Sequence, residues 1–249
     1  MQANTVLAVL GLAIASSACA MAETENLADP ATASLTGEAC PDVGERAYFF
    51  WMQPRSAEPG DEISLSPYWT DMPGSYNDLP PGCVGDLEAF PEDAVTFDRQ
   101  DDGLAIASIS ADAEPGTRVR LEATYRGAYA LSGIVDIYRE EENPLVGLWR
   151  QAGDSCPPES AVRELVFTGG NEMSVTWTPF EVYKDYWADY QYDPQTGAFS
   201  FEVEGGNQIP EDIVAAGTAQ VDGDRLVFKD VFFGTPRQAE GGCRATFVR

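Results

Sequence analysis

The residues that could do chemistry in this chain are carboxylates and aromatic rings, because the 249-residue sequence contains no histidine. Without histidine there are no Ser-His or Cys-His nucleophile pairs, no imidazole metal ligands and no proton shuttle of the usual kind at neutral pH. Glu181, Asp185 and Asp189 lie among aromatic residues, and paired carboxylates can cleave glycosides. However, the chain has 41 acidic residues, so carboxylates fall near one another by chance. We therefore predict no catalytic residue and a non-enzymatic protein, with a carboxylate-based hydrolase as a remote alternative.

The segment 177–192 is the densest aromatic stretch, with seven aromatic residues in sixteen. Rings that carry a hydroxyl or an indole N–H suit a pocket that stacks on a sugar or lines an apolar ligand. The alternative is that these rings fill a small eight-stranded barrel, which can be packed without a cavity. A period of two places Tyr186 and Tyr190 on one face of a strand and Trp187 on the other. The predicted ligand-binding residues are Trp177, Phe180, Tyr183, Tyr186, Trp187, Tyr190 and Asn207.

Two segments beside these rings are predicted loops. Pro179 interrupts the aromatic run and makes 179–184 a loop at a barrel mouth, where binding residues often lie. In the second segment, 204–210, Gly205 and Gly206 allow either a close approach of the backbone to a ligand or a turn with positive φ. The turn is the preferred interpretation, and we expect this loop to face the first one across the mouth.

The charge balance is strongly acidic, with 41 acidic against 15 basic residues and a formal net charge of -26. Such a surface repels phosphate backbones, which excludes nucleic acid as a partner. The carboxylates are dispersed along the chain, which indicates a soluble monomer. There is no Cys-x-x-Cys or EF-hand spacing, and Asp222-Gly223-Asp224 fits a hairpin turn better than a calcium site. We predict no metal and no cofactor.

Residues 1–20 have the pattern of a signal peptide. Val6 to Ala15 is an apolar run of about ten residues, which is too short for a permanent membrane anchor and suits export. Small residues around Ala20 and Ala22 fit ordinary signal cleavage, which would leave a soluble periplasmic or secreted protein. The polar segment 21–39 is typical of a flexible tether.

A second interpretation of the same region is lipidation. Ser17-Ala18-Cys19 resembles the lipobox of bacterial lipoproteins, in which the cysteine carries the lipid, although Ser16 departs from the aliphatic residue of that pattern. The resemblance implies a lipid anchor on Cys19 as the protein's contact with a membrane. Because Ala20 follows the cysteine, it also implies the periplasmic side of the outer membrane as the location.

Four cysteines remain once Cys19 is lipidated or removed, and an exported protein favours disulfides over free thiols. Four cysteines allow three connectivities. The charged, proline-containing segment 139–144 predicts a domain boundary. One bridge on each side of it gives Cys40–Cys83 and Cys156–Cys243, each with about 4 kcal/mol of loop-closure entropy.

Apolar and polar residues alternate nearly everywhere, which predicts an all-β chain. Val119, Leu121, Ala123 and Tyr125 form one such apolar face. Turn clusters separate the short strands of the first half, as is typical of a β-sandwich. The segment Pro115-Gly116-Thr117 before a strand resembles bacterial Ig-like domains. We predict an Ig-like β-sandwich at 40–141.

The second half contains eight short strands joined by tight turns, which predicts an eight-stranded up-and-down barrel at 142–249. Gly147-Leu148-Trp149 in the first strand matches the Gly-x-Trp that opens lipocalins, so this part resembles a lipocalin-like barrel. The resemblance implies that an arginine near the last strand, Arg244 or Arg249, covers Trp149. A Cys156–Cys243 bridge agrees with this, since the first and last strands of a closed barrel are neighbours.

These patterns lead us to expect an exported envelope protein that binds a small apolar or sugar-like ligand, or an envelope protein partner, at the mouth of a lipocalin-like barrel. The alternative is a structural or interaction lipoprotein with a filled barrel and no ligand.

Overall fold

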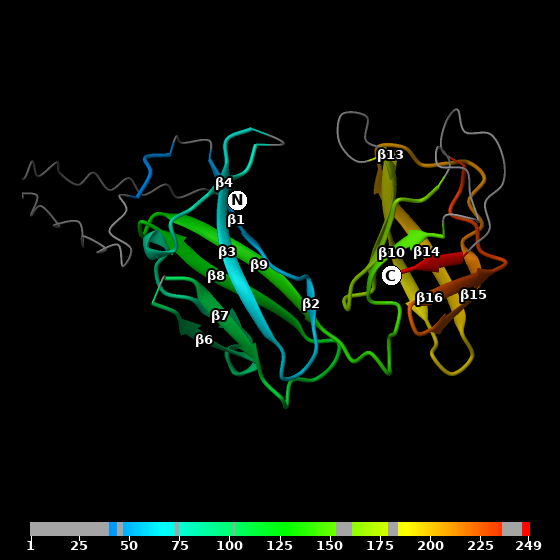
Figure 1. Ribbon diagram of the computed structural model, residues 1–249, viewed down its shortest axis with the longest axis horizontal. Coiled ribbons are helices and arrows are strands. Elements are labelled where there is room, and N and C mark those ends of the chain that lie inside the picture. Colours follow the sequence, from blue (N-terminus) through cyan, green and yellow to red (C-terminus); the bar gives the residue numbers. More distant parts are fainter. Residues whose placement is uncertain are drawn as a thin grey trace, which may run out of the picture. The chain divides into compact units, whose positions relative to one another are not determined.

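The computed structural model describes residues 40–43, 47–72, 75–101, 103–152, 161–178, 184–235 and 246–249. The predicted signal peptide (1–20), tether (21–39), lipidation site Cys19 and second disulfide Cys156–Cys243 lie outside these residues. The described chain consists of strands and two short 3-10 helices, so the all-β prediction is confirmed (Figure 1). Among the described residues, no helix has the length and apolar character needed to cross a membrane.

The first sheet contains nine strands. They are β1 (Tyr48–Met52), β2 (Ser56–Ala57), β3 (Glu62–Thr70), β4 (Asn77–Asp78), β5 (Glu88–Phe90), β6 (Val95–Arg99), β7 (Ala105–Ile109), β8 (Arg118–Tyr125) and β9 (Tyr129–Ile137), with 3-10 helices η1 (Pro81–Cys83) and η2 (Glu92–Ala94). Seven strands follow the order β5-β8-β9-β1-β3-β7-β6, while β2 pairs with β9 and β4 with β3 (Figure 1). Both β1 and β2 run parallel to β9, and the other pairs are antiparallel. This arrangement is consistent with a β-sandwich.

The predicted alternation packs the core of this sheet. Strand β8 buries Val119, Leu121, Ala123 and Tyr125 and turns the residues between them toward its other face. Burying one large apolar side chain contributes roughly 1.5–3 kcal/mol, so the three large ones on this strand, with Ala123 between them, fix its register strongly.

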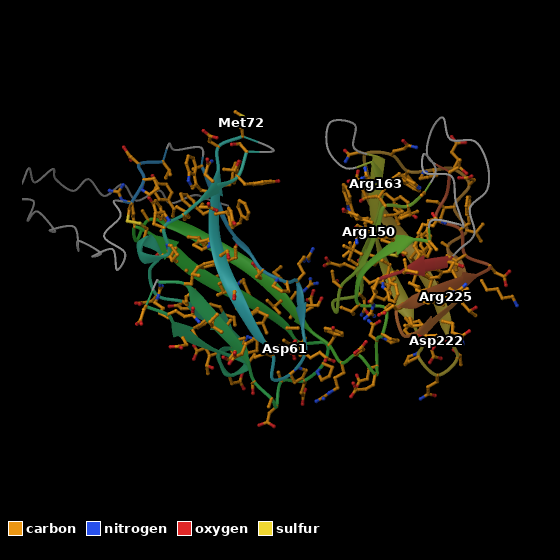
Figure 2. The ribbon with its side chains drawn as sticks, in the orientation of Figure 1. Asp61, Met72, Arg150, Arg163, Asp222 and Arg225 are labelled. Atoms are coloured by element: carbon orange, nitrogen blue, oxygen red, sulfur yellow. A yellow bond between two sulfur atoms is a disulfide. The ribbon has the colours of Figure 1, made fainter. Side chains whose placement is uncertain are left out.

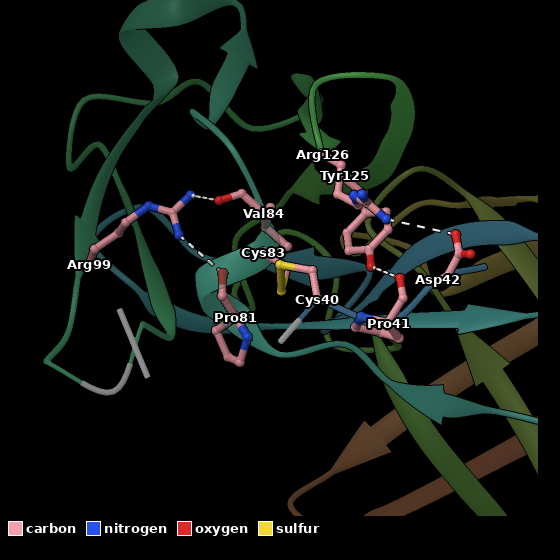
Figure 3. The surroundings of a disulfide bond; sticks show 9 residues. All are labelled: Cys40, Pro41, Asp42, Pro81, Cys83, Val84, Arg99, Tyr125 and Arg126. Atoms are coloured by element: carbon pink, nitrogen blue, oxygen red, sulfur yellow. Dashed lines mark hydrogen bonds and ion pairs between the residues drawn. A yellow bond between two sulfur atoms is a disulfide. The ribbon is translucent and has the colours of Figure 1, made fainter. Parts of the chain in front are cut away.

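Cys40 and Cys83 form the predicted disulfide, with their Cα atoms 5.6 Å apart (Figure 3). The bridge ties the start of the described chain to η1. Beside it, Arg99 donates to the carbonyl of Val84 at 2.9 Å, and the hydroxyl of Tyr125 donates to a backbone carbonyl next to Cys40 (Figure 3). The bridge and these hydrogen bonds hold the long connection after β4 in place.

The rest of the chain closes into an eight-stranded antiparallel barrel. Its strands are β10 (Gly147–Gln151), β11 (Glu164–Phe167), β12 (Glu172–Thr178), β13 (Lys184–Tyr192), β14 (Ala198–Gly206), β15 (Ala216–Asp222), β16 (Arg225–Lys229) and β17 (Thr246–Val248). Each strand pairs with the next, and β10 pairs with β17 through Arg150↔Val248. The predicted up-and-down barrel is therefore confirmed. Arg150, Arg163 and Arg225, labelled in Figure 2, are on its exposed surface.

The predicted domain boundary falls between Ile137, the last residue of β9, and Gly147, the first residue of β10. The domain limits themselves stay a prediction.

Aromatic side chains fill the described interior of the barrel. The ring centre of Phe199 lies 5.1 Å from that of Phe228 and 6.1 Å from that of Tyr190. Phe233 lies 5.0 Å from Phe228 and 5.7 Å from Phe247, both edge-to-face. Such pairs contribute about 0.5–1.5 kcal/mol each beyond the burial of their area. The described interior is thus a packed aromatic core.

Trp149 in β10 is fully buried, and its Nε1 donates to the carbonyl of Leu145 at 2.7 Å. Of the two arginines predicted to cover it, Arg249 has its guanidinium carbon 4.3 Å from the ring centre. Arg244 lies outside the described residues. Arg249 also donates to the carbonyl of Pro144 at 2.5 Å. These contacts fasten the end of the chain to the first barrel strand through a cation–π interaction.

An ionic network joins strands β8, β9 and β12. Glu172 accepts hydrogen bonds from Arg55 and Arg118, both at 2.7 Å. Arg118 also pairs at 2.7 Å with Asp136, a carboxylate that is only 1% exposed. Its hydrogen bonds to Asp136 and Glu172 raise the pKa of Arg118 further above its ordinary value. The buried Asp136 is therefore compensated by a permanently charged partner, as a buried carboxylate requires.

Candidate ligand-binding end of the barrel

One end of the barrel contains the last residues of β12, the first residues of β13 and the segment after β14. Thr178 in β12 pairs with Lys184 in β13, and Tyr186 in β13 pairs with Gly206 in β14. These registers place Lys184 and the segment 204–210, which are the described parts of the two predicted loops, at the same end of the barrel. Residues 179–183, which include the predicted ligand-binding residues Phe180 and Tyr183, lie outside the described part of the chain.

Asp185 anchors the segment after β14. Its backbone carbonyl accepts hydrogen bonds from the N–H groups of Asn207 at 3.0 Å and Gln208 at 3.1 Å. Its carboxylate accepts a third bond from Nδ2 of Asn207 at 2.6 Å. Asn207 stays exposed, whereas Gln208 is only 8% exposed. The three bonds thus fix the backbone of the segment that carries the buried Gln208 side chain.

The turn predicted at Gly205 and Gly206 is wrong. Both glycines belong to β14, and neither has a positive φ. They are required by close packing: a Cβ at Gly206 would lie 2.5 Å from the Cβ of Tyr186, and one at Gly205 would lie 2.8 Å from Cζ2 of Trp187. The register of β13 and β14 also shifts here, between Trp187 and Ala188. The sequence could not distinguish a turn from a strand that must pass close to two aromatic side chains.

The predicted ligand-binding residues do not share one surface. Trp177, Tyr186 and Tyr190 point into the barrel and are 3%, 0% and 2% exposed. Trp187 is 50% exposed and lies on the outer wall, as the period of two predicts. The structure therefore brings Trp177 and Tyr186 together, with ring centres 5.8 Å apart, and separates Trp187 from them.

Two buried N–H donors at this end have no hydrogen-bond partner within the described part of the chain. They are Nε1 of Trp177, at the end of β12, and Nε2 of Gln208. The backbones of both residues lie close to Asp185, since Trp177 follows Thr176, which pairs with Asp185, and the Gln208 N–H bonds to the Asp185 carbonyl. A buried donor without a partner costs about 1–3 kcal/mol. An acceptor that reaches both groups would remove that cost.

Gln208 is the residue that sequence reasoning missed. A glutamine in a polar loop after a strand is ordinarily exposed, and nothing in its neighbours signals burial. In the structure its backbone is anchored on Asp185 and its side chain is buried.

The two interior tyrosines are neutral hydrogen-bonding groups at neutral pH. Burial raises the pKa of Tyr186 far above its ordinary value, and its hydroxyl donates to the carbonyl of Phe233 at 3.0 Å. Burial also raises the pKa of Tyr190 to about 12. The hydroxyl of Tyr190 donates a hydrogen bond to the carbonyl of Thr168 at 2.8 Å. Because both protons are held by backbone carbonyls, the two hydroxyls do not act as acids or bases. Tyr190 bonds to the connection between β11 and β12, at the other end of β12 from Trp177.

Of the carboxylates considered for hydrolysis, the two that the structure describes are not gathered around these rings. Asp185 is engaged by Asn207, Asp189 is exposed on the outer wall, and Glu181 lies outside the described residues. Within the described ranges, no group of three or more His, Cys, Asp or Glu side chains is arranged to hold a metal ion.

A shallow groove of about 450 Å³ runs along the outer wall beside Trp187. Ser174, Asp189 and Glu172 are among its lining residues. This surface is separate from the interior donors and provides a control position for experiments on them.

Comparison with known proteins gives no relative on which to base a function. No known protein family matches the sequence, and no curated protein is significantly similar to it.

Proposed function

We propose that this chain is an exported, non-enzymatic binding protein whose ligand occupies the end of the barrel beside Trp177 and Gln208. The observation that carries the proposal is the pair of buried, unpartnered N–H donors at that end. Binding sites commonly combine an aromatic wall with a few buried polar groups that fix the orientation of the ligand. Here Trp177 and Tyr186 would supply the wall, and the indole and amide N–H groups would supply the polar contacts.

The ligand class follows from these donors and from the packed interior. Both unpartnered groups donate, so the ligand must present acceptor oxygens, as a sugar or a carbonyl-bearing apolar molecule does. Because aromatic rings fill the described interior, the ligand would rest on that core at the mouth and would not enter a deep lumen.

The cellular setting remains part of the proposal. The sandwich would be Ig-like and the barrel lipocalin-like, with Gly147 and the Trp149–Arg249 contact as the shared features. A lipid on Cys19 would hold the protein on the periplasmic side of the outer membrane. Ordinary signal cleavage would instead release it into the periplasm or the medium.

A second candidate is an interaction module with a filled barrel and no ligand. The continuous ring contacts of Phe199, Phe228 and Phe233 favour it. In that case, ordered water molecules would accept hydrogen bonds from Nε1 of Trp177 and Nε2 of Gln208.

Native mass spectrometry of the protein purified from the envelope of its source cells separates the two. We expect the natural chain to carry a small-molecule adduct and the Gln208→Met variant to lose it. Trp187→Phe, on the outer wall, should keep it. A natural chain that carries only the mass of the mature polypeptide and its anchor would reject the proposal and support the filled module.

A further inference from the structure

A groove opens in the first sheet where its parallel strands separate. Strand β1 pairs with β9 at Phe50↔Ser132, and β2 pairs with β9 at Ser56↔Asp136. From Phe50 to Ser56 the chain of β1 and β2 advances by six residues, whereas β9 advances by only four between the two residues that pair with them. The longer chain must bulge away from β9, as two extra residues in a strand do. The resulting groove has a volume of about 450 Å³ (strands in Figure 1).

Two buried polar atoms of the groove lining have no hydrogen-bond partner among the residues that the structure describes. Trp51 is 6% exposed, and its Nε1 donates to nothing. The Oε1 of Gln53 accepts from nothing, whereas its Nε2 donates to the carbonyl of Ile134 at 3.4 Å. One side chain therefore offers a donor and its neighbour offers an acceptor. Both line the groove.

Gly133 in β9 makes room for these two side chains. A Cβ at this position would lie 2.7 Å from Nε2 of Gln53 and 3.2 Å from Cδ1 of Trp51. Trp51 and Gln53 therefore converge over one backbone position. Any larger residue would push them apart or into the groove.

The groove is basic although the chain as a whole is strongly acidic. Arg55 and Arg120 line it, and none of its lining residues carries a carboxylate. Arg120 packs over the ring of Phe90 and pairs with Glu122 at 2.8 Å through Nε, while its side chain is 57% exposed. A guanidinium has five N–H donors, so one ion pair leaves others to face a ligand. Arg55 is engaged by Glu172 at 2.7 Å, so the exposed guanidinium of Arg120 is the group in this groove that can attract an anion, although the chain has a net charge of -26.

We propose that this groove is a second binding site, for a carboxylate that carries a neighbouring amide, as at the C-terminus of a peptide. The amide carbonyl would accept from Nε1 of Trp51, and the amide N–H would donate to Oε1 of Gln53. The carboxylate would face the guanidinium of Arg120, a charge-assisted contact of the stronger kind. The amide uses both unpartnered atoms at once, which a simple anion cannot do. The proposal does not depend on the ligand at the end of the barrel.

The test uses the full mature chain and a matched pair of probes. N-acetyl-alanyl-alanine has the carboxylate and the amides, and the same dipeptide with its C-terminus amidated lacks the charge. We expect calorimetry to show binding of the acid and at least tenfold weaker binding of the amide. Acetate, which lacks the amide, should also bind at least tenfold more weakly.

Variants assign the contacts. Trp51→Phe keeps a ring but loses the N–H, and should weaken binding of the acid about fivefold to tenfold. Arg120→Gln should weaken it at least tenfold and abolish the preference for the acid over the amide. Gly133→Ala should close the site. Arg126→Gln removes an arginine elsewhere on the same sheet, where it lies near Asp42, and should change nothing.

Two results would overturn the proposal. No binding of the acid at about 10 mM would mean that the groove holds only water, because one charged and two neutral hydrogen bonds should give measurable affinity at that concentration. Equal binding of acid and amide, unchanged in Arg120→Gln, would mean that the carboxylate is not recognised. If the acid binds as expected, a longer peptide with the same C-terminus identifies the source of the ligand. Weaker binding of the longer peptide would indicate a free dipeptide, and equal binding would indicate the C-terminal tail of a protein.

Discussion

Replacing Tyr190 with phenylalanine tests the packed interior of the barrel. The hydroxyl of Tyr190 donates to the carbonyl of Thr168 at 2.8 Å and accepts from Nδ2 of Asn143 at 2.7 Å. Its ring lies edge-on to Phe167, with 5.0 Å between centres. Phenylalanine keeps the ring contacts and deletes both hydrogen bonds. At about 1 kcal/mol for each bond, Tyr190→Phe should lower the free energy of unfolding by about 2 kcal/mol near pH 8.

Alkaline pH should remove most of this difference. Burial raises the pKa of Tyr190 to about 12 against the opposing effect of the Asn143 hydrogen bond, whereas a tyrosine in an unfolded chain ionises near pH 10. Because the folded pKa is raised, the stabilisation is complete below about pH 10 and is lost as the pH rises toward 12. Near pH 11, ionisation of residue 190 favours the unfolded natural chain by about 1.4 kcal/mol. The deficit of Tyr190→Phe should therefore fall from about 2 to about 0.6 kcal/mol.

Urea unfolding followed by far-ultraviolet circular dichroism at the two pH values measures both quantities. The other tyrosines are common to the two proteins, so their ionisation cancels in the difference. Tyr48→Phe is the control, since Tyr48 is 74% exposed and its replacement should change the unfolding free energy at neither pH. A Tyr190→Phe deficit that is absent near pH 8, or that stays constant up to pH 11, would refute a buried and hydrogen-bonded Tyr190.

Three further predictions concern stability and are measured by urea unfolding. Gln208→Met removes an unpartnered buried amide and should raise the free energy of unfolding by about 1 kcal/mol in the protein without ligand; a loss instead would show that the amide has a partner. Partial burial of Glu172 opposes ionisation, but the hydrogen bond from Arg118 and the charge of Arg55 outweigh it and lower the pKa of Glu172. Glu172→Gln should therefore cost about 1 kcal/mol at neutral pH, and the cost should disappear as the pH falls from the ordinary glutamate pKa of about 4.3 through the lowered pKa of Glu172; a cost that persists at still lower pH would contradict the ion pairs. Replacing both Cys40 and Cys83 by serine opens a loop of 43 residues and should cost about 4 kcal/mol, whereas a cost near zero would mean that the bridge constrains little.

Much of the fold could be predicted because strands carry a local signal. A period of two shows which residues of β8 are buried, and tight turns between sequential strands indicate an up-and-down barrel. The Cys40–Cys83 pairing followed from placing one bridge on each side of the 139–144 segment. The parallel pairing of β1 and β2 with β9 carries no such signal, because it depends on residues some eighty positions apart and leaves no pattern in either strand.

The candidate site was less predictable because it depends on packing between strands. Alternation correctly separates Trp187 from Tyr186 and Tyr190, but it cannot show that Gly205 and Gly206 lie in a strand against large rings. Gln208 is buried on a segment that three hydrogen bonds anchor to Asp185, and no sequence pattern specifies those bonds. The groove at Trp51 arises from a mismatch of two residues between strands, and that mismatch is visible only once the pairing is known.

The central claim is that a ligand binds at the end of the barrel beside Trp177 and Gln208. A high-resolution crystal structure of the protein purified from its source cells tests it most directly, because it shows which atoms accept hydrogen bonds from Nε1 of Trp177 and Nε2 of Gln208. The account predicts a bound molecule larger than water at this end of the barrel, with oxygen atoms about 3 Å from both nitrogens. Single ordered waters at both nitrogens, or hydrogen bonds from them to other protein groups, would contradict it.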